Sequence, residues 1–303
     1  MSPTWTLLAL ISTGVAAFVN TLDSHFLSRR MPGMRSYLLI IGIFTTLVAV
    51  IMLLIFPFPH GTEFRIYGLA LASAVSRVGA ISALMYALKK EDVSRVMPLT
   101  ATAPIFVAVM ASVFLGEGLR YTQWLAISIV VSGAILISFK RGADGSSRFH
   151  ASSFFMLIGS SLLYASSDVT NKYTMEFISY WNSASLSLFF TSVAFVIICL
   201  RRDVLRQIAG MERPWRTSAS VMLNQVASML STVLGFWAIQ NGPVALASTI
   251  FNSKPLFVFI YALVLARFAP GFLLESKTDR RGLAIKIIAT LMIVGGIALI
   301  FML

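Results

Sequence analysis

The 303-residue chain alternates long apolar stretches with short polar connections, and this alternation predicts its fold. Each stretch has about the 20 residues that a helix needs to cross roughly 30 Å of hydrocarbon. No run alternates apolar and polar residues at every second position, as the strands of a membrane barrel would. We therefore predict ten membrane-spanning helices, at about 5–27, 36–57, 66–88, 93–115, 121–139, 151–174, 181–200, 217–239, 244–266 and 283–302.

Composition supports a membrane class. Hydrophobic residues make up 57% of the chain, charged residues make up 12%, and the mean hydropathy is +0.84. A soluble chain is nearer 45–50% apolar and about 25% charged. The sequence therefore predicts an all-α integral membrane protein. We expect it to cross the plasma membrane many times, with the lipid bilayer as a constant partner.

The net charge of +12 has a topological explanation. Of the 24 basic residues, 18 fall in the odd-numbered connections between spans, and few fall in the even-numbered ones. Lys and Arg on short loops mark the cytoplasmic side. The bias predicts that the odd connections lie inside and that both termini lie outside, and it accounts for the charge without nucleic acid. The basic residues concerned are Arg29, Arg30, Arg35, Lys89, Lys90, Arg95, Lys140, Arg141, Arg148, Arg201, Arg202, Arg206, Arg213, Arg216, Arg267, Lys277, Arg280 and Arg281.

The spans form two similar sets. We divide the chain into a first five-helix repeat at 1–139, a basic connecting loop at 140–150 and a second repeat at 151–303. Pro104-Ile105-Phe106-Val107 in the first resembles Pro255-Leu256-Phe257-Val258 in the second. An odd number of spans makes the second repeat enter the membrane inverted. Inverted repeats are typical of secondary transporters, whose site lies near the midplane between the halves.

A family resemblance covers both repeats. The pattern Ala87-Leu88-Lys89-Lys90, Val93-Ser94-Arg95-Val96-Met97-Pro98-Leu99, Ala103-Pro104-Ile105, Phe114-Leu115-Gly116-Glu117 and Ser132-Gly133 resembles EamA-type proteins of the drug/metabolite transporter superfamily. The resemblance implies ten helices, alternating access and a central polar cavity. It does not imply one substrate, since members carry amino acids, drugs, nucleotide sugars, sugar phosphates or choline. Where the family usually has a second Gly-Glu, this chain has Ala266-Arg267.

Enzyme chemistry has little support in the sequence. No metal-ligand cluster, Walker loop, GxSxG or GxGxxG motif is present, and the three histidines are scattered at His25, His60 and His150. The lone cysteine, Cys199, lies in the seventh predicted span, where we expect a structural role. The first residues, Met1–Trp5, carry no basic residue, so we expect no cleavable signal. We predict no catalytic residue, metal or cofactor.

Ionisable residues inside apolar segments are the first candidates for a transport site. A charge near the bilayer centre costs roughly 2.5–3.5 kcal/mol on insertion scales, so such residues usually face a bundle interior or a water-filled cavity. Small neighbours around Arg77 let another helix approach closely. Arg77 therefore has two interpretations: substrate binding or gating, or a static ion pair with Asp23 or Asp168. Asp168 itself could carry a proton, pair with Arg77, or do both.

Lys254 is the strongest candidate for the transport site. It stands in Asn252-Ser253-Lys254-Pro255, and Pro255 removes a backbone donor and frees a carbonyl where a polar cavity could use it. Lys254 is about ten residues from both ends of its span, too far to reach the interface. Asn252 and Lys254 also resemble the Asn-Lys pair of nucleotide-sugar relatives. We predict that Lys254 contacts an anionic group of the substrate; a structural pair with Asp168 or Asp23 is the alternative.

Polar residues at helical spacing complete the candidate site. Single polar side chains also hold membrane helices together at about 0.6 kcal/mol each, which is the alternative for every one of them. Asp23, His25 and Lys172 lie near segment ends, where interfacial solvation is a further explanation, and Glu117 is expected to be an interfacial structural residue. The remaining candidates lie in the first, sixth and eighth spans: Asn20, Tyr164, Asn171, Asn224, Gln225 and Ser228.

These observations predict a secondary active transporter that moves a small polar solute by alternating access. Among the deep charges, Arg77, Lys172 and Lys254 outnumber Asp23 and Asp168, which favours an anionic or zwitterionic organic metabolite. We expect coupling to a proton or a counter-substrate, and a monomer or homodimer. One alternative is a transporter or flippase of an amphipathic or lipid-linked substrate. Another is a non-transporting scaffold or receptor, which would need a binding domain or long loop.

Overall fold

The computed structural model describes residues 4–90, 96, 99–138, 151–212, 214–268 and 280–302, and every regular element within them is helical. The all-α prediction is confirmed. The predicted loop at 140–150 and Lys277 of the last connection lie outside the described residues. The helices are α1 (Thr4–Arg29), α2 (Met34–Ile55), α3 (Phe64–Lys90), α5 (Ala103–Phe114), α6 (Tyr121–Ser138), α7 (Ala151–Thr174), α8 (Tyr180–Cys199), α9 (Arg202–Ala209), α10 (Pro214–Asn241), α11 (Val244–Phe251), α12 (Lys254–Phe268) and α13 (Arg280–Met302).

Helices occur in all ten predicted ranges, but not all have the length and apolarity of a span. Six segments do: Thr4–Leu27, Met34–Ile55, Phe64–Ala87, Tyr180–Cys199, Pro214–Asn241 and Val244–Tyr261, with shorter apolar helices at Ala103–Phe114, Tyr121–Leu136 and Ile287–Met302. α7 is not among the six, because its serines and Asp168 lower its mean hydropathy. The protein is thus a multi-pass membrane protein, and the count of ten crossings stays a prediction.

The predicted span at 244–266 is broken near its middle. α11 ends at Phe251, Asn252 and Ser253 form a turn, and α12 begins at Lys254. In the first half, α5 likewise begins only at Ala103, after a turn at 101–102. Pro104 and Pro255 are each the second residue of the new helix, where a missing N–H has no intrahelical partner to lose. The prolines therefore start helices, whereas the sequence predicts only a freed carbonyl near Pro255 within one continuous span.

One helix was missed by the sequence analysis. α9 lies between α8 and α10, in a region treated as a loop. It places Val204 and Ile208, four residues apart, against α2, while its arginines are exposed. The spacing of those two apolar residues was the available signal, but eight residues between charges give little periodicity to read.

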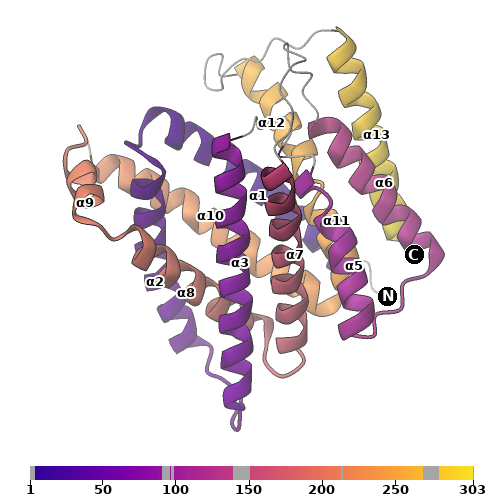
Figure 1. Ribbon diagram of the computed structural model, residues 1–303, viewed down its shortest axis with the longest axis horizontal. Helices are drawn as coiled ribbons and strands as arrows, with labels where there is room; N and C mark the ends of the chain where they lie inside the picture. The colour runs from indigo at the N-terminus through magenta and orange to yellow at the C-terminus, as the bar shows by residue number, and fades with distance from the viewer. Residues whose placement is uncertain are drawn as a thin grey trace.

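The two predicted repeats interlock through helix pairs. α1 packs on α10, α3 on α7, α2 on α8, and α6 on α13, so each pair takes one helix from each half of the chain. The α1–α10 and α3–α7 pairs are equivalent under exchange of the halves, as an inverted repeat requires. Figure 1 shows α3 and α7 running side by side through the centre of the molecule and α6 beside α13 at the right.

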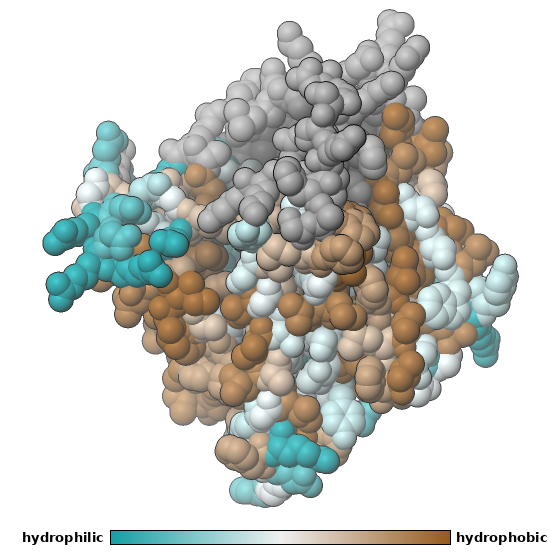
Figure 2. All heavy atoms as spheres, viewed as in Figure 1, coloured by the Kyte–Doolittle hydropathy of each residue, from teal (hydrophilic) through white to brown (hydrophobic). Residues whose placement is uncertain are grey.

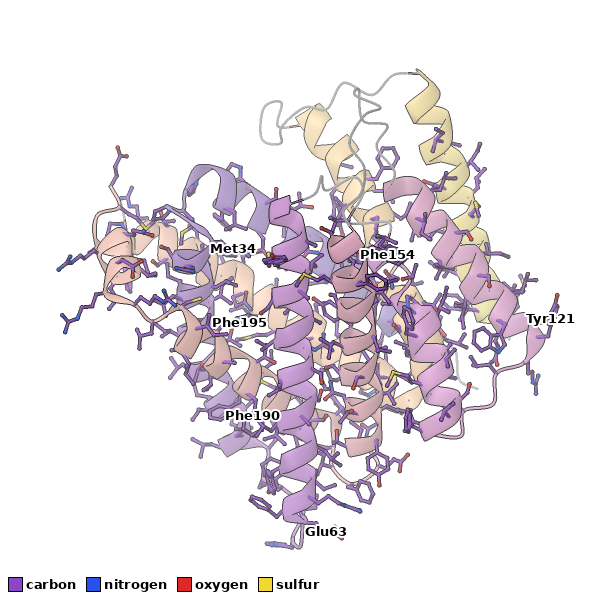
Figure 3. The ribbon with its side chains drawn as sticks, viewed as in Figure 1. Met34, Glu63, Tyr121, Phe154, Phe190 and Phe195 are labelled. Carbon is purple, nitrogen blue, oxygen red and sulfur yellow. The ribbon has the colours of Figure 1, made fainter. Side chains whose placement is uncertain are left out.

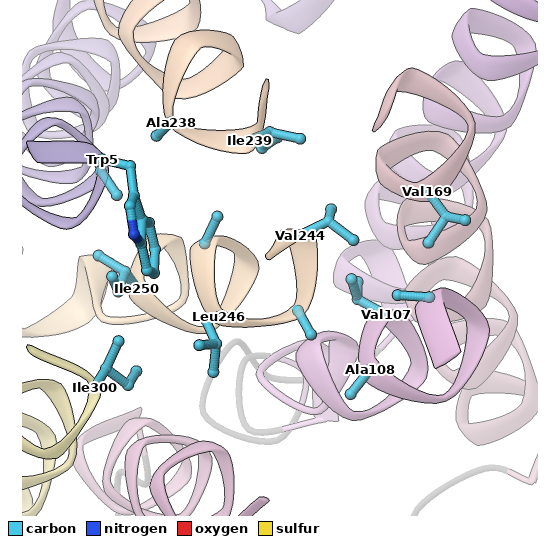
Figure 4. Packing of buried hydrophobic residues seen from close by; sticks show 14 of the residues in the cluster. Trp5, Val107, Ala108, Val169, Ala238, Ile239, Val244, Leu246, Ile250 and Ile300 are labelled. Atoms are coloured by element: carbon cyan, nitrogen blue, oxygen red, sulfur yellow. The ribbon is translucent and has the colours of Figure 1, made fainter. Parts of the chain in front are cut away.

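The main apolar core surrounds α11. Val244–Ile250 are all buried, and α1, α5, α7, α10 and α13 contribute neighbours such as Trp5, Val107 and Ile300 (Figure 4). The outer surface is apolar over a broad region, with hydrophilic residues gathered over α9 and at the lower end (Figure 2). Glu63, between α2 and α3, lies at the lower end of the molecule, and Met34, at the start of α2, lies well above it at the left (Figure 3). Such a surface suits a bilayer, where lipid covers the apolar region between two polar ends.

Candidate functional site

An ion pair joins α3 and α7. The Arg77 Nη2 donates to Asp168 Oδ1 at 2.5 Å, and Arg77 Nε donates to the Ser167 hydroxyl at 3.2 Å. The Arg77 guanidinium also lies over the ring of Tyr164, 5.8 Å from its centroid. The side chains of Arg77 and Asp168 keep 29% and 17% of their surface exposed, so the pair borders accessible space. Of the two partners proposed for Arg77, the structure selects Asp168.

Smaller polar groups continue this joint on either side of the ion pair. The Ser73 hydroxyl donates to Asn171 Oδ1 at 2.8 Å and lies 3.0 Å from the Ser167 hydroxyl. Ser160 donates to the Ala80 carbonyl at 2.8 Å. All these side chains come from small or short residues, which let two backbones approach closely enough for direct bonds. The joint is therefore a continuous polar seam within an otherwise apolar bundle.

The equivalent joint between α1 and α10 contains a carboxylate without a cation. Asp23 accepts hydrogen bonds from the Tyr37 hydroxyl and from Asn224 Nδ2, the latter at 2.6 Å. Deeper in the same joint, Ser12 and Ser231 exchange hydrogen bonds with each other's carbonyl, both at 2.8 Å. Asp23 is thus satisfied by neutral donors from α2 and α10, and it does not contact Arg77 or Lys254.

The turn between α11 and α12 places Lys254 at the first position of α12. Ser253 Oγ donates to the Ile250 carbonyl at 2.6 Å, and Thr13 Oγ1 from α1 reaches the same carbonyl at 3.4 Å. Lys254 is half-buried, and Asp168 and Arg77 are its electrostatic neighbours. No hydrogen bond or ion pair holds its ammonium within the described part of the chain. Lys254, Arg77 and Asp168 thus bring together charges from α12, α3 and α7.

A second charged arrangement lies at the turn between α10 and α11, and we call it the Glu117–Lys172 corner. Lys172 Nζ donates to the carbonyls of Ile239, Gln240 and Gly242 at 2.7, 3.1 and 2.9 Å. Across the turn, the Val244 N–H donates to both carboxylate oxygens of Glu117, at 3.0 and 3.2 Å. Lys172 thus lies at the C-terminus of α10, the negative end of its dipole, and Glu117 lies at the N-terminus of α11, the positive end. Both placements are electrostatically favourable.

Burial raises the pKa of Glu117 above its ordinary value, while the Val244 N–H and the Lys172 ammonium act in the opposite direction. The prediction that Glu117 is a structural residue agrees with these contacts. Lys172 was predicted as a substrate or coupling residue, and the structure places it here, with all three ammonium donors directed to the main chain. No local pattern in the sequence could have indicated this corner, since its residues come from three separate parts of the chain.

The other predicted site residues are distributed through the bundle. Asn20 is exposed on α1, His25 is half-buried with its ring against Phe26, and Asn252 is half-buried in the turn before Lys254. Gln225 is buried on α10 and Ser228 half-buried. The structure therefore gathers Arg77, Tyr164, Asp168 and Asn171 at the α3–α7 seam, with Lys254 of α12 as an electrostatic neighbour of the ion pair. Asp23 and Asn224 lie in the other seam.

Tyr37 was missed, although it is the hydroxyl donor to Asp23. A tyrosine near the start of an apolar span is common at membrane interfaces, so its type alone did not distinguish it. In the described residues, no three His, Cys, Asp or Glu side chains come together as metal ligands would.

Comparisons with known proteins agree with this architecture. A solved structure described only as a crystal structure of a protein superposes with a TM-score of 0.65 over 98% of this chain and 95% of that one, at 14% identity, which shows a shared fold. A Sinorhizobium protein named "Uncharacterized transporter in cobO 3'region" is 38% identical over 52 residues, 17% of this chain. The match spans only 37% of that relative's length. The sequence model of the EamA-like transporter family matches twice, over residues 3–139 and 151–274, and the chain therefore belongs to the EamA-like transporter family.

Proposed function

We propose that this protein is a secondary active transporter of a small anionic or zwitterionic organic metabolite, and that the solute binds between the α3–α7 ion pair and Lys254 of α12. Arg77, Asp168 and Lys254 are the charged residues of this site, with Tyr164 and Asn171 beside them. Asn252 lies in the turn that presents Lys254. Family membership supports the transport class, and the charge of the site supports the substrate class.

The observation that carries this proposal is the position of Lys254. Its ammonium has no hydrogen-bonding partner in the described residues and stands at the N-terminus of α12, the positive end of the helix dipole. A cation at that position is unfavourable by itself and becomes favourable when an anion binds. Half-helix N-termini in broken transporter helices direct the same polarity at anionic substrate groups.

The neighbouring ion pair refines the substrate class. Arg77 and Asp168 neutralise each other at 2.5 Å, so the site carries one net positive charge from Lys254. A monoanion would neutralise it. A zwitterion could place its carboxylate on Lys254 and its ammonium on the exposed part of Asp168. Release of a monoanion would restore the net charge of +1 to the site, whereas binding and release of a zwitterion would leave the net charge unchanged.

We also propose that the solute reaches this site by alternating access, with rocking about the α1–α10 and α3–α7 seams. Both seams join one half of the chain to the other, and the site lies on one of them. Asp168 is our candidate for coupling to a proton, and exchange with a counter-substrate is the alternative. We expect the plasma membrane as the location, and a monomer or homodimer.

Removal of Lys254 tests the proposal directly. Anionic and zwitterionic metabolites would first be screened for thermal stabilisation of the purified protein, since a ligand that binds only the folded state raises its apparent stability. Lys254→Ala should abolish the stabilisation by the best ligand and leave the melting temperature of the free protein nearly unchanged. Lys254→Arg should also bind poorly, since a planar fork does not replace a compact ammonium.

The matched control is Arg120→Ala, an exposed cation outside the site, which should bind as wild type does. The same variants would then be reconstituted in liposomes for flux measurements. Wild-type flux by a stable Lys254→Ala protein would remove Lys254 from the site. Ligand binding without any flux by the wild-type protein would favour a receptor.

A further inference from the structure

A second charged surface lies away from the α3–α7–α12 site, at the opposite end of the bundle from the Glu117–Lys172 corner. We call it the basic shelf and define it by its exposed arginines: Arg30 after α1, Arg201, Arg202 and Arg206 at α9, and Arg216 at the start of α10. Asp203 and Glu212 are the acidic residues of the same described segments, so the shelf is clearly positive. Figure 2 shows a hydrophilic patch over α9 at the left of the molecule.

The shelf contains a cleft of about 1080 Å³ between the α1–α2 turn and the α9–α10 connection. Its wall is mixed: Arg30, Arg216 and Gln207 provide polar groups, and Met31, Met211 and Trp215 provide apolar ones. Glu212 also lines it. A ligand that fits this wall needs an anionic part and an apolar part.

Structural contacts hold the shelf in place at the end of the apolar bundle. Val204 is buried against Leu39 of α2, and the Ser36 hydroxyl donates to Gln207 Oε1 at 3.1 Å. α1 ends at Arg29, α2 begins at Met34, α8 ends at Cys199 and α10 begins at Pro214. The cleft therefore lies where the spans end, at the depth of the lipid headgroups.

Two large apolar residues of the shelf are exposed. Trp215 is 79% exposed and Leu205 48% exposed, and each is followed in the chain by an exposed arginine, Arg216 and Arg206. Tryptophan is enriched at the membrane interface, where its ring lies at headgroup level. A short amphipathic helix with basic residues beside exposed apolar ones is the pattern of a segment that lies in the interface plane.

We propose that the basic shelf binds an anionic glycerophospholipid, with its phosphate between Arg30 and Arg216 and its acyl chains along Trp215 and the apolar surface below. A soluble anion would use the arginines but would leave Trp215 and Leu205 in water. A neutral phospholipid would gain the apolar contacts without the charge. Basic pockets at the ends of membrane helices recognise anionic headgroups by this combination.

The other end of the molecule provides a matched comparison. Among the described residues, its exposed cations are Arg65, which pairs with Glu63 at 3.2 Å, and Arg120. Replacing Arg65 and Arg120 with neutral residues removes two positive charges, as replacing Arg30 and Arg216 does. The first pair lies at the membrane interface opposite the basic shelf. All four side chains are exposed, so none of the substitutions disturbs the core.

The experiment measures lipid retention in nanodiscs that contain phosphatidylcholine with phosphatidylglycerol, by native mass spectrometry of the released protein. The wild type should retain phosphatidylglycerol in preference to phosphatidylcholine. Arg30→Gln/Arg216→Gln should lose roughly tenfold of this preference, because two basic residues near an anionic surface are removed. Arg65→Gln/Arg120→Gln should keep it, and Trp215→Ala should weaken retention of both lipids.

Three results would overturn the proposal: equal retention of the two lipids by the wild type, equal loss in both double variants, or displacement of the bound lipid by millimolar inorganic phosphate. The last would identify a soluble phosphate compound as the ligand. None of these outcomes depends on Lys254 or on flux, so the test is separate from that of the proposed transport function. Melting temperatures of all variants in detergent provide the check on folding.

Discussion

At the scale of single residues, the partly buried cations Arg77 and Lys254 differ in the partners that stabilise their charge. Arg77 has a counterion at 2.5 Å, a hydroxyl on Nε and an aromatic face beside it, whereas Lys254 has only electrostatic neighbours. Breaking a partly buried ion pair leaves an uncompensated charge, while removing an unpaired charge leaves none. The two cations should therefore respond to substitution in opposite ways, one through stability and the other through binding.

Asp168→Ala is expected to destabilise the protein by about 3–5 kcal/mol, because it leaves Arg77 without its counterion. Arg77→Met in the same chain should restore most of the loss, since the stranded charge is then gone. Thermal melting in detergent measures both effects. Asp203→Ala, an exposed acid on α9, is the control and should melt as wild type. Additive losses in the Arg77→Met/Asp168→Ala double variant would mean that the two residues do not act as a pair.

At the scale of elements, two glycines determine how closely α6 and α13 approach. A methyl group on Gly133 would lie 2.8 Å from the Ile293 side chain and 3.0 Å from the Ala289 carbonyl. One on Gly296 would lie 2.6 Å from Val130. Gly295, one residue earlier, has nothing within 4 Å of that position. Successive glycines on one helix therefore have different roles, and only Gly296 is required for contact.

Gly133→Ala should lower the melting temperature, because the added methyl group meets the backbone of α13 and forces the two helices apart. The overpacking is expected to cost about 1–3 kcal/mol. Gly295→Ala is the matched substitution and should be neutral or stabilising, since alanine favours the helix and meets open space. Comparable losses in the two variants would show that helix packing at Gly133 is not the cause.

The Glu117–Lys172 corner leads to a second prediction at this scale. Lys172→Met should destabilise the folded protein by roughly 1.5–3 kcal/mol, because three carbonyls at the end of α10 lose a charged donor. Arg206→Met, which removes an exposed cation on α9 away from the corner, should change little and is the control. Thermal melting in detergent is again the measurement. If Lys172→Met kept its full stability and lost ligand binding, the earlier assignment of Lys172 to the substrate site would regain support.

The elements also show what could be read from the sequence. α2 and α8 were predicted within two residues, because length and apolarity are local properties. A freed carbonyl near Pro255 was predicted because proline acts on its own helix, but the division of the span into α11 and α12 was not. The partners of Asp23 and Lys172 were not, since Asn224 is 201 positions from Asp23 and the carbonyls that Lys172 binds belong to the main chain of α10. Periodicity identifies the inward side of a helix but not which helix it faces.

At the scale of the whole molecule, the two ends of the bundle differ in chemistry. One end has the basic shelf and the other has the Glu117–Lys172 corner with the tightly packed Trp5 and Gly242. Lys and Arg near the ends of spans orient a membrane protein with that end inside. The basic shelf should therefore face the cytoplasm, as the loop charges predict.

The orientation can be tested at the C-terminus. A reporter that is active only outside the cytoplasm should give signal when fused after Leu303, because the terminus lies opposite the basic connections in the predicted topology. The same reporter inserted after Gly210, in the α9–α10 connection, should be silent and is the internal control. A cytoplasmic reporter that is more active at Leu303 than at Gly210 would reverse the assignment.

The long-range seams also constrain how the chain is made. Tyr37 is synthesised 14 positions after its hydrogen-bond partner Asp23. Asn224, the other donor to Asp23, is synthesised only 201 positions after it. Arg77 precedes Asp168 by 91 positions, so α3 enters the membrane before its counterion exists. Until α7 is synthesised, the Arg77 guanidinium needs water or another polar environment, since an unpaired charge in hydrocarbon costs several kcal/mol. We therefore expect the insertion of the first half to be completed only when the second half has been synthesised.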